Sequence, residues 1–331
     1  MRSLVTGGAG FIGSHLAEAL YNRKDEVWVI DDLSTGRRKN IAHLEKAERF
    51  HFIEGTVLDS SLVSKTIKKV DRVFHLAASV GVKYVMENPL RSLINNIRGT
   101  EVVLEEASRR GCKVILFSTS EVYGKGNGYK FREDDDRVLG PTAVSRWSYA
   151  SSKAVDEFLA FAYWRQHRLP VVIVRCFNTC GPRQTSTYGM VVPTFVEQAL
   201  NGEPIAVYGD GTQTRCFSYV GDVVRGVLDL AESEGAVGEV FNIGTDEEVT
   251  VSELAERVKK ITGSQSLIKY VPYEDVYHGE FEDMMRRVPD LSKIRESIGY
   301  SPRVNLTELL RIVVEDVKSE LESLKKTVLT S

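Results

Sequence analysis

The sequence predicts an α/β protein that has a doubly wound parallel sheet and a smaller C-terminal α/β lobe. Three observations point to this class. A glycine-rich turn at residues 6–13 lies between two short apolar runs. The first 180 residues alternate short β-rich runs with helical patterns, which is typical of a parallel sheet covered by helices. Beyond Gly181 this regular alternation changes, and the change indicates a second lobe.

The predicted elements follow from hydrophobic periodicity. Strands are expected at residues 3–5, 27–30, 50–54, 73–76, 114–118 and 171–175, with helices from Ser14, from about Ser60, and at 93–110 and 149–166. Later strands are expected at 205–208, 216–219 and 240–243, with helices at 194–200, 221–230, 252–261 and from Leu306. No linker or repeat separates the two parts. We therefore expect residues 1–180 to form a dinucleotide-binding (Rossmann) domain and residues 181–331 mainly a substrate lobe, some of whose segments return to the first domain.

The glycine turn has the spacing of a dinucleotide-binding βαβ unit. Gly7 allows a tight turn, Gly10 lets the backbone approach a pyrophosphate, and Gly13 lets the following helix lie close to the sheet. The free amides at the start of that helix would face the phosphates. Gly7, Gly10, Phe11, Ile12 and Gly13 are therefore predicted to contact the cofactor.

An acid at the end of the second predicted strand selects the cofactor. Asp31 stands eighteen residues after Gly13, where a carboxylate accepts hydrogen bonds from the adenosine ribose and repels a 2′-phosphate. This favours NAD over NADP. Arg37 and Arg38 follow and could hold that phosphate instead, but we interpret them as a solvated basic loop at the adenosine edge.

Composition excludes several classes of function. The 331 residues are 42% hydrophobic and carry a formal net charge of -3, and the pI is near 6.1, so neither nucleic acid nor an anionic membrane is an expected partner. No apolar stretch has the length of a membrane span and no signal peptide precedes the first strand, so we expect a cytoplasmic protein. The four cysteines and six histidines lack metal-ligand spacing, which predicts reduced thiols and no metal site.

Tyr149 and Lys153 form the second piece of predicted chemistry. Four residues apart on a helix, the phenol and the ammonium project from one face. A nearby cation favours the phenolate, so the pKa of Tyr149 is expected to fall toward neutral pH, and the lysine can also hold a ribose hydroxyl. The preceding predicted strand ends at Ser118, Thr119 and Ser120, where ligands bind in a doubly wound sheet.

These motifs resemble those of the extended short-chain dehydrogenase/reductases that modify nucleotide sugars. The resemblance covers nearly the whole chain and rests on TGGAGFIG, HLAA at 75–78, NNIRGT, STSEVYG at 118–124, YASSK at 149–153, FNTCGPR at 177–183, VYGDG, TRCFSYVGDVV and PDLSKIRESIGY. It implies that Asp59 lies at the adenine, Ala77 by the nicotinamide half and Asn96 in the cofactor site. For a UDP-sugar, it implies that Thr119 contacts the 4-hydroxyl and that Tyr208 contacts the uracil. The diphosphate would be held by Asn178, Arg215 and Arg287. The resemblance also places Lys83, Arg183 and Val192 in the substrate site.

The triplet of Thr119, Ser120 and Glu121 narrows the branch. The dTDP-glucose 4,6-dehydratases carry aspartate in the middle position, whereas Thr-Ser-Glu resembles the UDP-glucuronate decarboxylases. Some UDP-glucuronate 4-epimerases have a second arginine two residues after the GPR motif, where this chain has Thr185. The resemblance is therefore strongest to the decarboxylases, with the UDP-sugar 4-epimerases close by.

The expected reaction begins when Tyr149, aided by Thr119 or Ser120, takes the proton of the 4-hydroxyl while hydride passes from carbon 4 to NAD. In a uronic acid the new ketone makes a β-keto acid that loses carbon dioxide. Glu121 and Arg215 are expected to orient the carboxylate and to supply the proton that ends on carbon 5. The alternatives are 4-epimerisation of UDP-glucuronate or UDP-glucose and, more remotely, a non-catalytic NAD-binding protein. Helices 93–110 and 149–166 resemble the family's dimerising pair, so a homodimer is expected.

Overall fold

A seven-stranded parallel sheet forms the centre of the computed structural model, which describes residues 1–126, 128–187, 189–277 and 282–329, apart from the side chains of residues 82–83 and 324–329. The strand order is β11-β6-β5-β4-β1-β2-β3, and every neighbouring pair is parallel. The strands are β1 (Arg2–Thr6), β2 (Glu26–Asp31), β3 (Phe50–Glu54), β4 (Arg72–His75), β5 (Lys113–Thr119), β6 (Val171–Cys176) and β11 (Glu239–Ile243). The order reverses between β1 and β4, and ligands bind beyond the carboxyl ends of strands at such a reversal.

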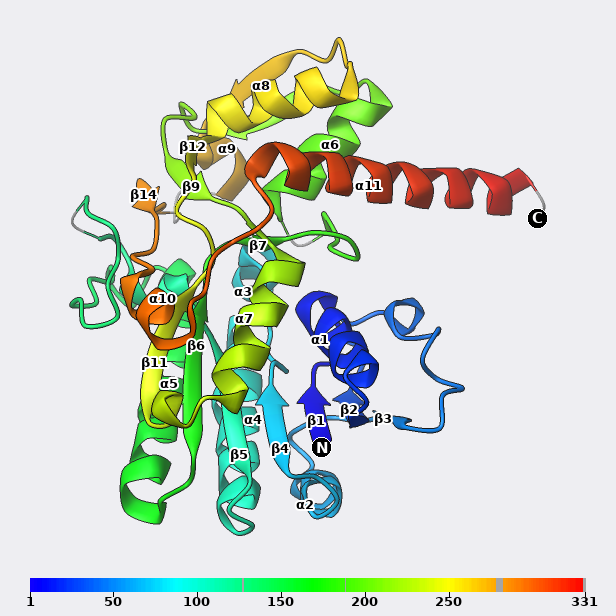
Figure 1. Ribbon diagram of the computed structural model, residues 1–331. Helices are drawn as coiled ribbons and strands as arrows, with labels where there is room; N and C mark the ends of the chain where they lie inside the picture. The colour runs from blue at the N-terminus through cyan, green and yellow to red at the C-terminus, as the bar shows by residue number, and fades with distance from the viewer. Residues whose placement is uncertain (127, 188, 278–281, 330–331) are drawn as a thin grey trace.

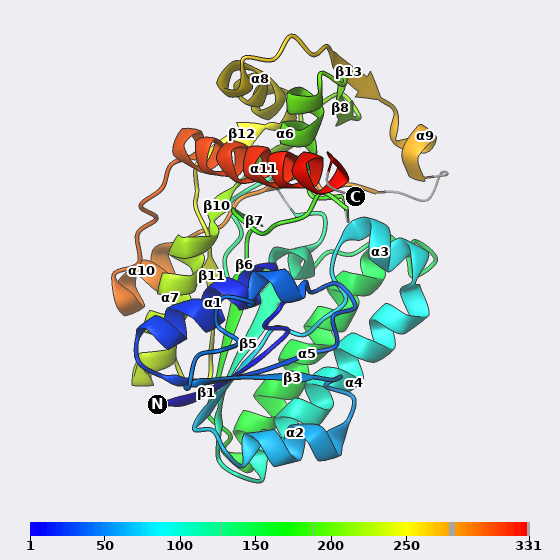
Figure 2. The same ribbon diagram turned by 90° about the vertical axis from the view of Figure 1, so that its right-hand side faces the viewer.

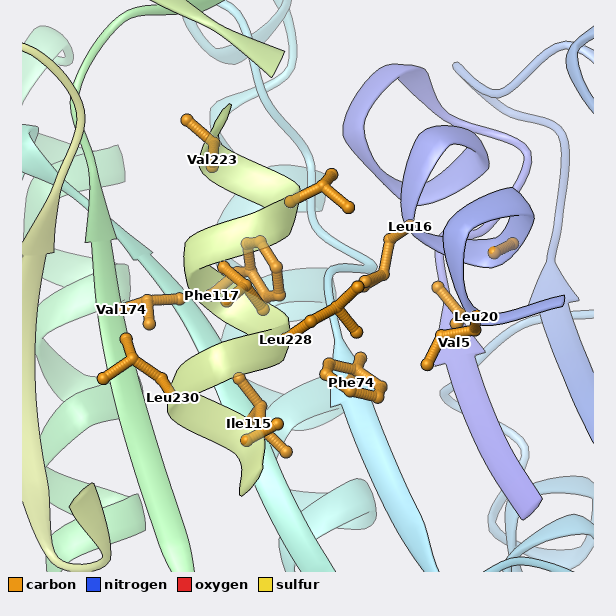
Figure 3. Packing of buried hydrophobic residues seen from close by; sticks show 14 of the residues in the cluster. Val5, Leu16, Leu20, Phe74, Ile115, Phe117, Val174, Val223, Leu228 and Leu230 are labelled. Atoms are coloured by element: carbon orange, nitrogen blue, oxygen red, sulfur yellow. The ribbon is translucent and has the colours of Figure 1, made fainter. Parts of the chain in front are cut away.

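Helices cover both faces of the sheet (Figures 1 and 2). One face carries α1 (Phe11–Asn22), α7 (Val220–Glu232) and α10 (Ser292–Ile298), and the other carries α2 (Ser60–Ile67), α4 (Pro89–Ser108) and α5 (Arg146–His167). Leu16 and Leu20, one turn apart on α1, pack with Leu228 of α7 over Phe74 of β4 (Figure 3). Truncating such a fully buried leucine to alanine costs about 2–5 kcal/mol.

The second lobe lies above the carboxyl edge of the sheet (Figure 1). Its core joins three helices, α6 (Val191–Asn201), α8 (Val251–Thr262) and α11 (Leu306–Leu329). A reciprocal capping box between Thr250 and Glu253 starts α8, and Gly263 ends it in a left-handed conformation. The remaining strands are β7 (Thr179–Cys180), β8 (Ile205–Tyr208), β9 (Thr214–Cys216), β10 (Ser218–Tyr219), β12 (Glu248–Thr250), β13 (Ile268–Val271) and β14 (Arg286–Arg287), and the short helices are α3 (Val82–Glu87) and α9 (Tyr273–Tyr277).

The fold class predicted from the sequence is confirmed, and the differences are local. The first helix begins at Phe11 rather than Ser14, and Leu76 lies outside β4. The predicted strand at 216–219 is two short strands, because β9 pairs with β12 and β14 whereas β10 pairs with β7. Elements α3, α9, α10, β12, β13 and β14 were not predicted, since such short segments contain too few residues to show a period. Although α7, β11 and α10 follow residue 181, they pack on the main sheet.

Within the described part of the chain, no helix combines the length and the apolar character that a membrane crossing requires.

Candidate active site

A cavity of about 520 Å³ lies between the carboxyl edge of the sheet and the second lobe. Its lining includes the glycine turn after β1, the end of β5, the start of α5 and residues of the upper lobe. The cavity therefore coincides with the point where the strand order reverses, as expected for an open α/β sheet.

The glycine turn is tightly packed around its own backbone. Gly7 has a φ of 70°, which glycine adopts without strain. A Cβ atom at Gly13 would lie 2.1 Å from the carbonyl oxygen of Gly7, so only a glycine lets α1 start this close to the turn. Gly7, Gly10, Phe11, Ile12 and Gly13 all line the cavity. The turn is thus a cradle whose open side faces the cavity.

Asp31 ends β2 beside this cradle and lines the cavity. Its Oδ2 accepts the backbone N–H of Ala9 at 2.9 Å, and its Oδ1 accepts that of Leu33 at 2.8 Å. Burial raises the pKa of Asp31, while these two hydrogen bonds act in the opposite direction. A Cβ at Gly36 would come within 2.7 Å of the carboxylate, so a glycine there keeps the approach to Asp31 open.

The two arginines after Asp31 differ in position. Arg37 lines the cavity, but its guanidinium already contacts Glu320 at 3.1 Å and Thr185 Oγ1 at 2.7 Å. Arg38 pairs with Glu45 at 2.7 Å and lies outside the cavity lining. Each cation of the predicted basic loop therefore has an anionic partner within the protein.

Three other predicted cofactor residues occupy different surroundings. Ala77 lines the cavity. Asp59 instead caps α2, where one carboxylate oxygen accepts the N–H groups of Ser61 and Leu62. Asn96 is buried, and its Oδ1 accepts the N–H of Ser79 at 2.7 Å. Neither Asp59 nor Asn96 is among the described residues that line the cavity.

Tyr149 and Lys153 both line the cavity from α5, and the Thr119 side chain hydrogen-bonds Tyr149. The predicted fall in the pKa of Tyr149 is wrong for this structure. Burial raises that pKa, and the negative charge of Glu121 raises it further. The Lys153 ammonium lies 2.7 Å from the carboxylate of Asp156, whose negative charge offsets it. The prediction failed because the sequence pattern showed the cation and not its counter-ion.

Glu121 is buried between two arginines. Arg146 Nη1 lies 2.5 Å from Glu121 Oε2, and Arg287 pairs with the other carboxylate oxygen. Burial alone would raise the pKa of Glu121, but the positive charges of Arg146 and Arg287 outweigh it and lower the pKa to about 2. A carboxyl group with this pKa is ionised at neutral pH. This argues against Glu121 as the source of the proton for carbon 5, a role predicted for it together with Arg215.

The predicted anion-binding side chains reach the cavity from both lobes. Arg287 also donates to Asn178 Oδ1, and Arg215 pairs with Asp283 at 2.8 Å. Asp283 in turn accepts the hydroxyl hydrogen of Tyr273 at 2.8 Å. Thr119, Ser120, Asn178, Arg183, Val192, Tyr208, Arg215 and Arg287 all line the cavity. Lys83 falls within α3, but its side chain lies outside the described residues.

Sequence reasoning missed four residues of this site. Arg146, Asp283 and Tyr273 line the cavity, and Asp156 contacts Lys153 behind it. Spacing along α5 could have indicated two of them, because Arg146 and Asp156 stand three residues from Tyr149 and Lys153 on the same helical face. No motif or spacing in the nearby sequence indicates that Asp283 or Tyr273 belongs to the site. Among the described residues, no group of three His, Cys, Asp or Glu side chains could hold a metal ion.

Comparison with known proteins gives a consistent result. Residues 4–313 match the model of the GDP-mannose 4,6-dehydratase family. The UDP-N-acetyl-alpha-D-glucosaminuronate decarboxylase of Bacillus cytotoxicus is 42% identical over 95% of this chain and 97% of its own length. UDP-glucuronic acid decarboxylase 1 of Arabidopsis thaliana is 38% identical over 97% of this chain and 71% of its own. The structure of UDP-glucuronic acid 4-epimerase from Bacillus cereus, with UDP-glucuronic acid and NAD, has a TM-score of 0.85 at 33% identity and covers 97% of this chain and 100% of its own.

Proposed function

The chain belongs to the GDP-mannose 4,6-dehydratase family, and within it we propose that the chain is an NAD-dependent decarboxylase of a UDP-linked uronic acid. One observation carries the proposal: a buried cluster of Glu121, Arg146 and Arg287 borders the cavity beside Tyr149. Two guanidinium groups and one carboxylate leave a net positive charge there. The carboxylate of a uronic acid supplies a negative charge on the sugar ring that can pair with this cluster, whereas the ring of a neutral hexose supplies none.

The names of two relatives support this choice. The Bacillus cytotoxicus and Arabidopsis thaliana proteins are both decarboxylases of UDP-linked uronic acids. They differ in whether the sugar carries an N-acetyl group, so the product analysis compares both uronates.

The residues present fit a dinucleotide cofactor. The glycine cradle would hold the pyrophosphate against backbone amides at the start of α1, and Asp31 would accept hydrogen bonds from the adenosine ribose, which selects NAD. When bound, NAD supplies a reversible acceptor for the hydride of carbon 4.

The side chains of this protein would handle the protons and the charges. In its phenolate form Tyr149 would take the proton from the 4-hydroxyl and become a phenol, with Thr119 hydrogen-bonded to the same oxygen. Oxidation at carbon 4 makes the uronic acid a β-keto acid, whose carboxylate leaves as carbon dioxide because the electron pair moves onto the carbon 4 oxygen. The phenol of Tyr149 stabilises the charge there, and Glu121 stays ionised. The proton on carbon 5 therefore comes from a donor other than Glu121.

A 4-epimerase of a UDP-sugar is the second candidate. The observation that favours it is the likeness to the Bacillus cereus UDP-glucuronic acid 4-epimerase, which extends over almost the whole chain. Epimerisation would use the same first half-reaction, after which the keto sugar turns over and accepts hydride on its other face.

The test is a product analysis. The protein is incubated with NAD and, separately, UDP-glucuronate, UDP-N-acetylglucosaminuronate and UDP-glucose, and each product is identified by mass spectrometry and NMR. We expect one uronate to lose the mass of carbon dioxide and give a UDP-pentose or its 4-keto form. A uronate product of unchanged mass and inverted carbon 4 would replace the decarboxylase with the epimerase. Conversion of UDP-glucose alone would contradict the role given to the charged cluster.

We also propose that two copies associate through α4 and α5, which pack against each other. Leu90 on α4 is 72% exposed and Phe158 on α5 is 64% exposed, and exposed apolar groups on adjoining helices favour association. Light scattering should give the mass of a dimer, and Phe158→Glu should reduce it toward that of a monomer. A wild-type monomer at assay concentration would contradict the proposal.

A further inference from the structure

A fully buried ion pair lies behind the predicted catalytic residues. Asp156 has an exposed fraction of 0% and Lys153 one of 3%, and Asp156 Oδ2 lies 2.7 Å from Lys153 Nζ. Glu157, the next residue, does not share this contact, because its carboxylate binds Arg175 and the hydroxyl of Ser118. The proposed reaction assigns no role to Asp156. Burying a carboxylate at this depth is costly, so its place beside Lys153 calls for a reason.

The pair connects to the glycine turn through buried side chains. The side chain of Thr100 favours the ionised form of Asp156, and Thr100 Oγ1 lies 3.1 Å from His75 Nε2. His75 Nδ1 lies 2.8 Å from Thr6 Oγ1. Thr6 directly precedes Gly7 and accepts the backbone N–H of Ala77 at 3.2 Å. Lys153 is thereby tied to the residue that precedes the cofactor cradle.

The direction of these hydrogen bonds follows from the groups involved. Burial lowers the pKa of His75 to about 3, and the charge of Lys153 acts the same way, so the imidazole is neutral. Because Thr6 Oγ1 already accepts backbone N–H groups, its hydroxyl hydrogen is directed to His75 Nδ1, and His75 Nε2–H donates to Thr100. The hydroxyl hydrogen of Thr100 is then not used by His75, which agrees with the stabilising effect of Thr100 on the ionised form of Asp156. Among the described residues, Asp156 Oδ1 has no hydrogen-bond partner, so the contact of Oδ2 with Lys153 Nζ is what favours a single position for the ammonium.

We propose that Asp156 is the counter-ion and positioning residue of Lys153, which fixes the ammonium between Tyr149 and the glycine turn and sets the pH range in which Tyr149 acts. The inference rests on the proposed function for its catalytic consequence, but the ion pair itself can be tested without turnover. Because the negative charge of Asp156 offsets that of Lys153, the lysine favours the phenolate of Tyr149 less than an unpaired ammonium would.

The groups around this ion pair shift the pKa values of Tyr149 and Asp156. Glu121, Cys176 and Asp156 raise the pKa of Tyr149, while the hydrogen bond with Thr119 lowers it. The charge of Glu157 raises the pKa of Asp156, and that of Lys153 lowers it. Replacing Asp156 by asparagine removes one of the negative charges that face Tyr149 and leaves Glu121 and Glu157 in place.

The test compares Asp156→Asn with a matched control, Asp222→Asn. Asp222 is also buried and also pairs with a cation three residues away on its own helix, Arg225 at 2.5 Å on α7, but it lies outside the cavity lining. Turnover is measured against pH for the wild type and both variants. We expect the acid limb of the Asp156→Asn profile to move to lower pH by on the order of half a unit or more, and that of Asp222→Asn to stay in place. In Asp156→Glu, which keeps the negative charge, the acid limb of the pH profile should lie close to that of the wild type.

A second readout needs no substrate. With ring-labelled tyrosine, the NMR signal of Tyr149, assigned by its loss in Tyr149→Phe, is followed as the pH rises to the onset of unfolding. In Asp156→Asn this signal should move toward that of a phenolate at lower pH than in the wild type. Coincident signals in the two folded proteins, or an equal displacement in Asp222→Asn, would overturn the inference. If the protein turns over no UDP-sugar but the signals differ, the proposed function fails and the role of Asp156 as counter-ion stands.

Discussion

Glu121 and Asp156 are two buried carboxylates whose charges both act on Tyr149, and their own pKa values are shifted in opposite directions. Burial disfavours the charged form of both. At Glu121 two guanidinium groups outweigh this effect and lower the pKa to about 2. At Asp156 a single ammonium does not, so the pKa is raised. Both carboxylates are buried, so the number of neighbouring cations, and not burial, decides which of the two pKa values is lowered.

The opposite shifts give opposite contributions to the pH dependence of stability. The folded pKa of Glu121 is depressed, so its stabilising contribution is present above the unfolded pKa of about 4.5 and is lost as the pH falls toward 2. The folded pKa of Asp156 is raised, so the folded protein binds its proton more tightly than the unfolded chain does. Its contribution therefore becomes more favourable as the pH falls through that folded pKa.

The largest expected effect comes from removing the phenol on which both carboxylates act. Tyr149→Phe should fold and bind NAD with unchanged affinity, but its turnover should fall about a hundredfold or more, the usual scale for a positioned general base. Calorimetry and a turnover assay measure the two quantities. A variant that keeps turnover within about threefold of wild type would remove Tyr149 from the proposed mechanism.

Glu121→Gln tests the carboxylate that pairs with Arg146 and Arg287. The lowered pKa of Glu121 corresponds to on the order of 3 kcal/mol of stability at neutral pH, and the variant also leaves Arg146 and Arg287 without their counter-ion. Urea unfolding should show the variant less stable at pH 7, with the difference narrowing below pH 4.5. Turnover should be lost with NAD binding intact. Asp71→Asn, which breaks the more exposed pair with Arg2, is the control and should change stability much less. A difference that does not depend on pH would contradict the strongly lowered pKa.

Asp31 provides a third buried carboxylate, whose partners are neutral N–H groups. The wild type should bind NAD about tenfold or more tightly than NADP, the scale of a hydrogen bond to a charged group. Asp31→Asn should narrow this preference, as measured by calorimetry with both dinucleotides. Equal or tighter binding of NADP by the wild type would mean that Arg37 or Arg38 governs the cofactor site.

Glu320 gives the smallest expected effect, because its pairs with Arg37 and Lys39 lie at the surface. Glu320→Gln should change the free energy of unfolding by less than about 0.5 kcal/mol. Chemical denaturation at moderate salt measures it. If Glu320→Gln lowered the free energy of unfolding as much as Glu121→Gln, solvent exposure would not explain the difference between the two ion pairs.

The sequence by itself determined the elements whose signals are local. The alternation of apolar runs predicts the first six strands of the sheet, and the spacing of Gly7, Gly10 and Gly13 predicts a cradle that the structure builds. Tyr149 and Lys153 share a helical face for the same reason: both patterns repeat within a few residues of the chain.

Tertiary structure alone decided the electrostatics of the site. Arg287 stands 166 residues from Glu121 along the chain, yet the two form an ion pair, and Asp283 reaches Arg215 over 68 residues. Such partners leave no periodic trace in the sequence. The pKa of each carboxylate depends on all the charges and the solvent around it, so even the local pair of Lys153 and Asp156 did not reveal its effect on Tyr149 until the packing around it was known.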